Sequence, residues 1–351
     1  MGPEWEKKNL ETQVYERLRH DVVCIRSLLG HLSGVKEFSL HWDENEVFHT
    51  ELYTAFLDQL QKHRRSMTPA PWSAISKLSL KLPPTLLNQL PYLQLDQLHT
   101  FDFHFATGDL IQSEIHAFHE GLLVLLHNLK DVVRQLSFTS TAASQNFDMS
   151  WLFHHLSNPH SFYFHQLRSL SVSIPADGSQ LSDPKLFTTF LERHIRTLEH
   201  IAIHTNDVLP RRSIGNTPNS DFIPIVLAGI SKNFYPLRSF EVSYPFHGNL
   251  EALALFIVRS LRTLTSLSIQ HRVFHLSEIR VLFHHLAYQG LAYITDLKLA
   301  MFDLDGALLT DLAVLFPGLS SLQIDYRHAS HIGVGHIDLR ASAYLVSVPT
   351  Y

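Results

Sequence analysis

The chain has 351 residues, more than one compact core usually holds, which favours two domains or one elongated array of repeats. Its hydrophobic content of 45% and charged content of 17% exclude a disordered chain. The net charge of −5 is spread without a basic or acidic block, so we expect neither nucleic acid nor a membrane among its partners.

Cys24 is the only cysteine, which rules out a disulfide within the chain. The first ten residues are charged where a secretory signal peptide would be apolar. No apolar run reaches the roughly 18 residues that a membrane-spanning helix needs. We therefore expect an intracellular protein, cytoplasmic or nuclear, in a reducing compartment.

A six-residue pattern, apolar-x-x-apolar-x-apolar, recurs along the chain and is called the strand motif below. Its fifth position is Ser in five copies, at Ser39, Ser79, Ser137, Ser171 and Ser268. The mean spacing of about 32 residues lies in the range of solenoid repeats. The ten copies begin at Val35, Ile75, Leu98, Val133, Leu167, Leu198, Leu237, Leu264, Ile294 and Leu319.

Most intervals between strand motifs contain one segment with apolar residues at three- and four-residue spacing, which predicts a helix. Ser182, Asp183 and Pro184 predict the start of one helix, and Ser277 before Glu278 predicts the start of another. The predicted helices are Val47–Leu60, Leu110–Leu129, Leu186–Leu198, Phe222–Phe234, Leu250–Leu264, Ile279–Tyr288 and Ala307–Phe316.

Strands with one apolar side cannot bury that side alone, so we expect them to stack into a parallel sheet that packs on a row of helices. Because helices are wider than strands, the sheet should line the concave side. Crowding on that side explains the small serines at position five. The predicted fold is an α/β solenoid with about ten parallel strands on the concave face and helices on the convex face.

A strand motif followed by a helix resembles the leucine-rich-repeat family, and the resemblance covers roughly Val35 to Tyr326. The Asn or Cys that normally follows the strand is missing, and residues such as Trp42, Phe105 and Pro175 stand there instead. Long repeats of this kind are similar to the repeat half of fungal F-box and leucine-rich-repeat proteins. Asn9–Leu32 lacks the Leu-Pro start of an F-box, so no F-box residue is assigned.

We predict three parts: an N-terminal helical cap at 1–34, a leucine-rich-repeat-like solenoid at 35–325 and a C-terminal cap at 326–351. The predicted function is non-catalytic recognition of another protein. The resemblance implies substrate recognition for a ubiquitin ligase, with an adaptor or a substrate as the partner. The alternative is a free-standing scaffold. No cofactor or metal is expected.

The predicted partner-binding residues point outward from the concave face, at positions three, five and seven of the strand motifs. Plain solvation of these side chains is the competing interpretation. The residues assigned to binding are Glu37, His41, Asp102, His104, His200, His204, Glu241, Asp296 and Lys298.

Met301–Leu309 reads MFDLDGALL and is similar to the first motif of haloacid-dehalogenase-like phosphatases. That resemblance implies Asp303 as the nucleophile and Asp305 as the acid and base, beside Mg²⁺. Only 46 residues follow Asp305, fewer than that family needs, and a strand, turn and helix also explain the stretch. We therefore keep catalysis as a remote alternative.

The chain contains 25 histidines, and two pairs of them are adjacent in sequence, at His154–His155 and His284–His285. On a helix, adjacent side chains diverge by about 100°, so neither pair favours a shared metal ion. Histidines titrate just below neutral pH, and their number predicts a pH-sensitive protein.

Overall fold

The computed structural model describes residues 15–28, 34–41, 51, 53–55, 74–82, 95–105, 112–141, 147–158, 162–206, 222–245, 249–289, 293–304, 306–329 and 335–340. The chain divides into two compact units, Met1–Val133 and Arg134–Tyr351, each of which is described by itself. Both units combine parallel strands with helices, which confirms an α/β fold. None of the helices formed by the described residues is long and apolar enough to cross a membrane.

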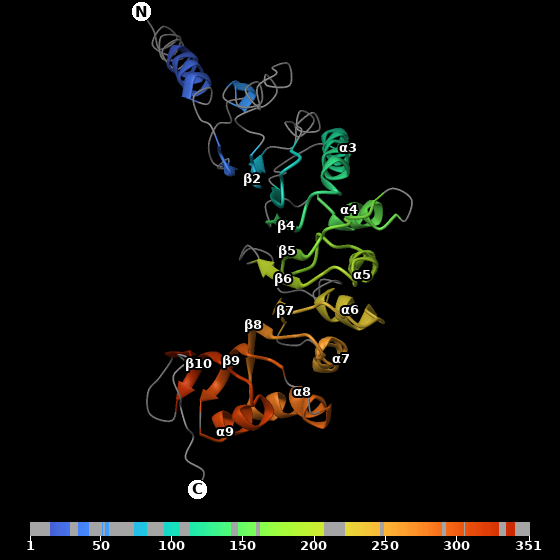
Figure 1. Cartoon of the computed structure of the whole chain (residues 1–351), viewed down its shortest axis with the longest axis vertical. Helices are drawn as coiled ribbons and strands as arrows, with labels where there is room; N and C mark the ends of the chain where they lie inside the picture. The colour runs from blue at the N-terminus through green and yellow to red at the C-terminus, as the bar shows by residue number, and fades with distance from the viewer. Residues whose placement is uncertain are drawn as a thin grey trace, which may run out of the picture. The chain divides into compact units, whose positions relative to one another are not determined.

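The described part of the first unit contains parallel strands that pair in chain order, followed by a long helix (Figure 1). The helix packs on the last strand through Phe118, whose ring meets that of Phe105 edge-on at 5.9 Å between centroids. These elements are β1 (Glu37–His41), β2 (Lys77–Leu82), β3 (Thr100–Phe105) and α3 (Gln112–Leu129).

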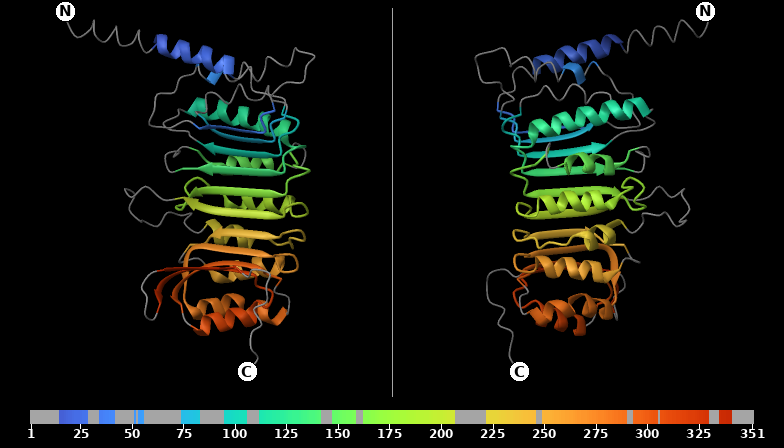
Figure 2. Two further views of the ribbon diagram at one scale, coloured as in Figure 1. Left: turned by 60° about the vertical axis from the view of Figure 1, so that its left-hand side comes forward. Right: turned by 90° about the vertical axis from the view of Figure 1, so that its right-hand side faces the viewer.

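The second unit alternates strands and helices, and Figures 1 and 2 show its helices gathered on one face of its sheet. Strands β4 to β10 are parallel and pair in chain order, whereas β11 pairs antiparallel with β10. The elements are β4 (Gln135–Ser140), α4 (Met149–Leu156), β5 (Ser169–Pro175), α5 (Pro184–Arg193), β6 (His200–Asn206), α6 (Phe222–Gly229), β7 (Ser239–Ser243), α7 (Leu250–Ser260), β8 (Ser266–Phe274), α8 (Leu276–Gln289), β9 (Asp296–Leu304), α9 (Gly306–Leu315), β10 (Ser321–Ala329) and β11 (Gly335–Arg340).

All ten strand motifs form strands, and each strand begins at the third residue of its motif. The third residues also pair with one another, as Ser169 does with His200 and His200 with Ser239. The same register holds where Ser266 and Ser321 both pair with Asp296. The prediction of about ten parallel strands is therefore confirmed, and the structure adds a common register of the motifs within each unit.

A repeated backbone contact precedes the strands. Within each unit, the carbonyl of a motif's second residue accepts from two consecutive N–H groups of the next motif. Arg168 O, for example, accepts from Glu199 N at 2.7 Å and His200 N at 2.9 Å. Where the second residue is Ser or Thr, its hydroxyl donates to the same carbonyl, as Thr295 does to Thr265 at 3.2 Å. Ser76, Thr265 and Ser320 repeat this contact. These bonds satisfy the carbonyls at the strand starts.

Positions four and six of the motifs are buried, as strand alternation predicts, except in β1, where Phe38 and Leu40 are half-buried. In the second unit they pack on aromatic side chains of the helices. The ring of Phe138 on β4 meets Phe153 on α4 at 6.5 Å, and Phe153 meets Phe187 on α5 at 4.5 Å. Complete burial of each such ring contributes about 1.5–3 kcal/mol. The core thus continues from one repeat to the next.

The helix predictions are confirmed in position, with ends shifted by a few residues, except that Val47–Leu60 lies mostly outside the described residues. Asp183 caps α5 as predicted, since its Oδ1 accepts from Lys185 N at 3.0 Å. The predicted start at Ser277 is wrong, because α8 begins at Leu276. Glu278 Oε2 accepts from the N–H of His275 at 2.9 Å, which fixes the earlier start.

Helix α6 ends at Gly229, short of the predicted end at Phe234. The N–H and hydroxyl of Ser231 both donate to Glu192 Oε1, at 2.6 and 2.7 Å, so the chain turns toward α5. A Cβ atom at Gly229 would lie 3.1 Å from Thr188 Cγ2. Glycine therefore permits the close approach of these two helices.

Two features differ from the sequence interpretation. Asn206 ends β6 at the position where an Asn was predicted to be missing: its amide donates to Ser140 O, and its Oδ1 accepts from Ser173 Oγ at 2.5 Å. Strand β11 lies within the predicted C-terminal cap, and β10 runs past the predicted boundary at residue 325 to Ala329. The division into cap, solenoid and cap stays a prediction.

Candidate functional site

The outward residues of the strand motifs form the polar face of each unit, defined by motif positions three, five and seven. These positions alternate with the buried positions four and six, so they lie on the side of the sheet away from the core. All nine residues assigned to partner binding from the sequence lie on this face, and each is exposed or half-buried. Their role in binding stays a prediction.

In the first unit, two predicted histidines come together on the polar face. His41 Nε2 lies 2.9 Å from Ser79 Oγ, and the rings of His41 and His104 are 5.4 Å apart between centroids. Burial lowers the pKa of His104, and the neighbouring His41 lowers it further, while Asp102 opposes both. Ser79 is only 7% exposed, so its hydroxyl positions the His41 ring and is poorly placed to reach a ligand.

The acidic residues beside these histidines, Asp102 and Glu37, interact with the same charged neighbours. Burial raises the pKa of Asp102, while the positive charges of Lys77, His104 and His41 oppose that rise. Glu37 lies 3.9 Å from Lys77 in an exposed ion pair. This part of the polar face therefore combines a partly buried carboxyl with two imidazoles.

In the second unit, the polar face gathers side chains from β6, β7 and β8. Burial lowers the pKa of His204, Glu241 raises it, and His271 lowers it. Thr205 Oγ1 lies 3.0 Å from His271 Nδ1, and the amide of Gln270 donates to Glu241. The result is a polar cluster in which a carboxylate lies among two imidazoles, a hydroxyl and an amide.

An irregularity in β8 brings His271 to this cluster. Ser268 pairs with Lys298 and Val273 with Ala300, so β8 advances five residues while β9 advances two. His271 has φ 64°, the left-handed conformation that a residue with a Cβ atom rarely adopts. Such a bulge re-aims a side chain and is often found near binding sites.

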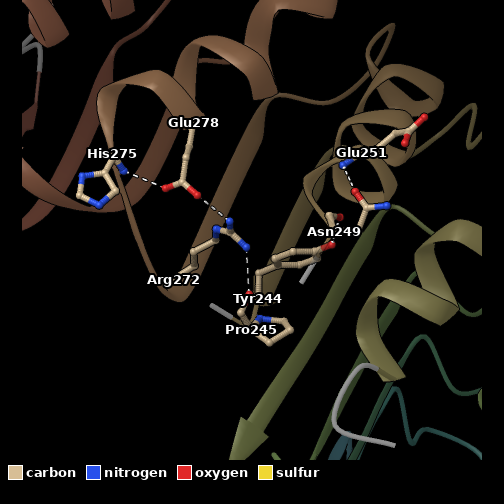
Figure 3. Close-up of polar contacts among 7 residues, drawn as sticks. All are labelled: Tyr244, Pro245, Asn249, Glu251, Arg272, His275 and Glu278. Carbon is tan, nitrogen blue, oxygen red and sulfur yellow. Dashed lines mark hydrogen bonds and ion pairs between the residues drawn. The ribbon is translucent and has the colours of Figure 1, made fainter. Parts of the chain in front are cut away.

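An ion pair between Arg272, within the bulge, and Glu278 fixes the chain there (Figure 3). Arg272 Nη2 donates to Glu278 Oε1 at 2.7 Å, and Nη1 donates to Pro245 O at 3.1 Å. The Arg272 side chain is 6% exposed and lies over the ring of Tyr244 at 5.9 Å. This contact ties β8 to the start of α8 and to the segment after β7, which holds His271 in place on the opposite side.

Hydrogen bonds favour the charged form of Glu278. Burial raises the pKa of Glu278, but hydrogen bonds from the His275 N–H and from Arg272 outweigh that effect and hold the pKa below its usual value. Glu278 is therefore a carboxylate around neutral pH, and its contact with Arg272 supports the polar face from within the fold.

The other three predicted residues of the second unit are more scattered. His200 lies at the start of β6, four residues before His204, while Asp296 and Lys298 lie on β9, two strands from Glu241. Sequence reasoning missed Gln270 and His271. Their place directly after the LTSLSI motif is visible in the sequence, but the bulge that turns His271 outward leaves no local signal.

The chemical alternatives receive no support from the described geometry. No three His, Cys, Asp or Glu side chains among the described residues lie close enough to hold a metal ion. The MFDLDG stretch forms the end of β9 and the start of α9, with Asp303 exposed, while Asp305 lies outside the described residues. The strand-turn-helix interpretation of this stretch thus accounts for the elements seen around it.

No protein-family model and no curated protein matches this chain.

Proposed function

We propose that this chain is a leucine-rich-repeat-like solenoid that recognises another protein, without catalysis, through its polar face. The observation that carries the proposal is the cluster of His204, Glu241, Gln270 and His271, which lies on a face that the helices leave to solvent. Charged and amide groups presented by neighbouring strands offer a partner several hydrogen-bonding groups at once, on rigid elements.

The solenoid part of the proposal rests on the repeats. Strand starts, pairing register and the hydrogen bonds before each strand recur from motif to motif within each unit. In a repeat protein each repeat packs mainly on its neighbours, and the stacked strands supply an extended surface for partners. The polar face is that surface here.

A more specific role follows from the resemblance to F-box and leucine-rich-repeat proteins: the partner would be a substrate that the chain presents to a ubiquitin ligase. The alternative is a scaffold with no link to a ligase. The two are separated by the identity of the captured proteins, because a ligase adaptor should accompany the substrate in the first case and be absent in the second.

The test is affinity capture with mass spectrometry from the source cells, using the wild-type chain and a Glu241→Lys, Lys298→Glu variant. A Lys185→Glu, Glu251→Lys variant is the matched control, because it exchanges the same charges on exposed residues of α5 and α7. We expect the polar-face variant to lose partners that the control keeps. If both variants keep them, binding lies elsewhere and the proposal fails.

A further inference from the structure

A second surface of the Arg134–Tyr351 unit, at the edge of the sheet where the strands begin, is rich in positive charge. Exposed cations gather there from the strand starts and from the turns that lead into them. Acidic side chains also lie at these starts and turns: Glu199, which is partly covered, and Asp296, which is exposed at the start of β9. The cations are Arg134, Arg168, Arg196, Lys232, Arg238 and Arg262.

Helix dipoles explain only part of this charge. Cations in the last turn of a helix stabilise it, and Arg259 does so while donating to the carbonyl of Ile230. Arg134, Arg168 and Arg238 differ, because they occupy the second position of strand motifs, outside any helix. Their alignment follows from the repeat itself, which places the same motif position side by side on successive strands.

Glu199 lies between two of these arginines. Its Oε1 accepts from Arg168 Nη1 at 3.0 Å, and its Oε2 lies 4.0 Å from Arg238 Nε. The arginine side chains are 61% and 67% exposed, against 22% for Glu199. One partly covered carboxylate therefore orients two guanidinium groups that still face solvent, and the edge keeps a positive charge.

A hollow of about 390 Å³ opens beside Arg238, lined also by Glu199, Tyr235, Pro236, Thr263 and Thr265. Tyr235 is 68% exposed at this hollow, an unusual position for a large aromatic ring. Tyrosine and arginine are the residue types that most often dominate binding energy at protein interfaces. The edge thus combines a hollow, in which Tyr235 and Pro236 offer apolar surface beside polar groups, with flanking positive charge.

We propose that this edge binds an acidic, extended peptide segment of a partner protein, with an apolar side chain in the hollow and carboxylates on Arg168 and Arg238. The two arginines lie just before β5 and β7, two strands apart, which is about 10 Å. In an extended chain, side chains on the same side lie two or four residues apart, about 7 or 13 Å, so carboxylates at these spacings bracket the distance between the arginines. Glu199, at the centre of the edge, disfavours the unbroken negative charge of a nucleic acid.

The experiment is fluorescence anisotropy with the full chain at low ionic strength. The probe is a fluorescein-labelled ten-residue peptide with glutamate at positions one, three and seven and phenylalanine at position five, so that all four side chains lie on one side of the extended chain. An Arg168→Gln, Arg238→Gln variant should weaken binding by at least about tenfold, the loss of two charge-assisted contacts. Tyr235→Ser should weaken it as well. A Lys185→Gln, Arg280→Gln variant, which removes two exposed cations elsewhere, should bind like wild type.

Three results would overturn the proposal: no binding of the probe by the wild-type chain, equal weakening by the two double variants, or equal affinity for a probe with glutamine in place of glutamate. A fourth, tighter binding of a fluorescein-labelled single-stranded oligonucleotide than of the peptide, would assign the edge to phosphate. Circular dichroism and thermal unfolding of each variant exclude loss of the fold as the cause of weaker binding.

Discussion

His194 ends helix α5 and is fully buried, which makes the stability of the second unit depend on pH. Its Nε2 accepts the N–H of Phe164 at 3.2 Å, and its Nδ1 donates to Phe190 O at 3.0 Å. Burial lowers the pKa of His194 from 6.5 to about 4, although the bond to Phe190 acts in the opposite direction. The folded chain therefore holds a neutral imidazole at neutral pH.

Unfolding exposes this imidazole and restores its ordinary pKa near 6.5. Because the folded pKa is the lower one, the unfolded state binds the proton first, and acidification favours unfolding. The contribution of the neutral His194 to the free energy of unfolding is fully present above pH 6.5 and is lost as the pH falls from there to about 4. A difference of about 2.5 pKa units corresponds to about 3 kcal/mol.

The assay is urea unfolding, followed by tryptophan fluorescence, at several pH values between 7.5 and 4. His194→Gln removes the titrating group, so the difference in unfolding free energy between wild type and variant should shrink by about 3 kcal/mol across that range. His154→Gln, an exposed change on α4, should leave the wild-type slope intact. A wild-type slope that persists unchanged in His194→Gln refutes the reasoning.

Two further predictions concern stability at neutral pH and use the same unfolding assay. Glu278→Ala leaves the buried Arg272 without its carboxylate and should lower the free energy of unfolding by about 3 kcal/mol. Asp311→Ala breaks an exposed pair with Arg280 and should lower it by less than about 1 kcal/mol. Equal losses in the two variants would contradict the structural role of the buried pair. Asp183→Ala removes the cap of α5 and should lower the free energy of unfolding by about 1 kcal/mol, while Asp183→Asn should be as stable as the wild type. An alanine variant as stable as the wild type would show that the cap contributes little.

The strands and their register could be predicted because the information is local and repeated. Three apolar residues at fixed spacing recur ten times, and the parallel sheet aligns equivalent motif positions. Helix starts with a strong cap signal, such as Asp183 before Pro184, were also predictable. The start of α8 was not, because Glu278 accepts from the N–H of His275, whereas the sequence pattern placed the helix start at Ser277.

The clusters on the polar face were predictable only in outline. Alternation placed His41, His104, His204 and Glu241 outward, but nothing local indicates that His41 lies beside His104. That contact depends on how separate repeats stack. The turn at His271 depends on tertiary contacts as well, because the neighbouring residue is drawn inward by a buried ion pair with the next helix.

The most direct test of the central claim, that the polar face recognises a partner protein, is site-specific photocrosslinking in the source cells. Ser268 is the place for the reactive side chain, since it pairs with Glu241 on one side and Lys298 on the other. Leu255, 42% exposed on helix α7, is the control position. We expect discrete crosslinked proteins from Ser268 and none of these from Leu255. The same crosslinks from Leu255, or none from Ser268, would contradict the account.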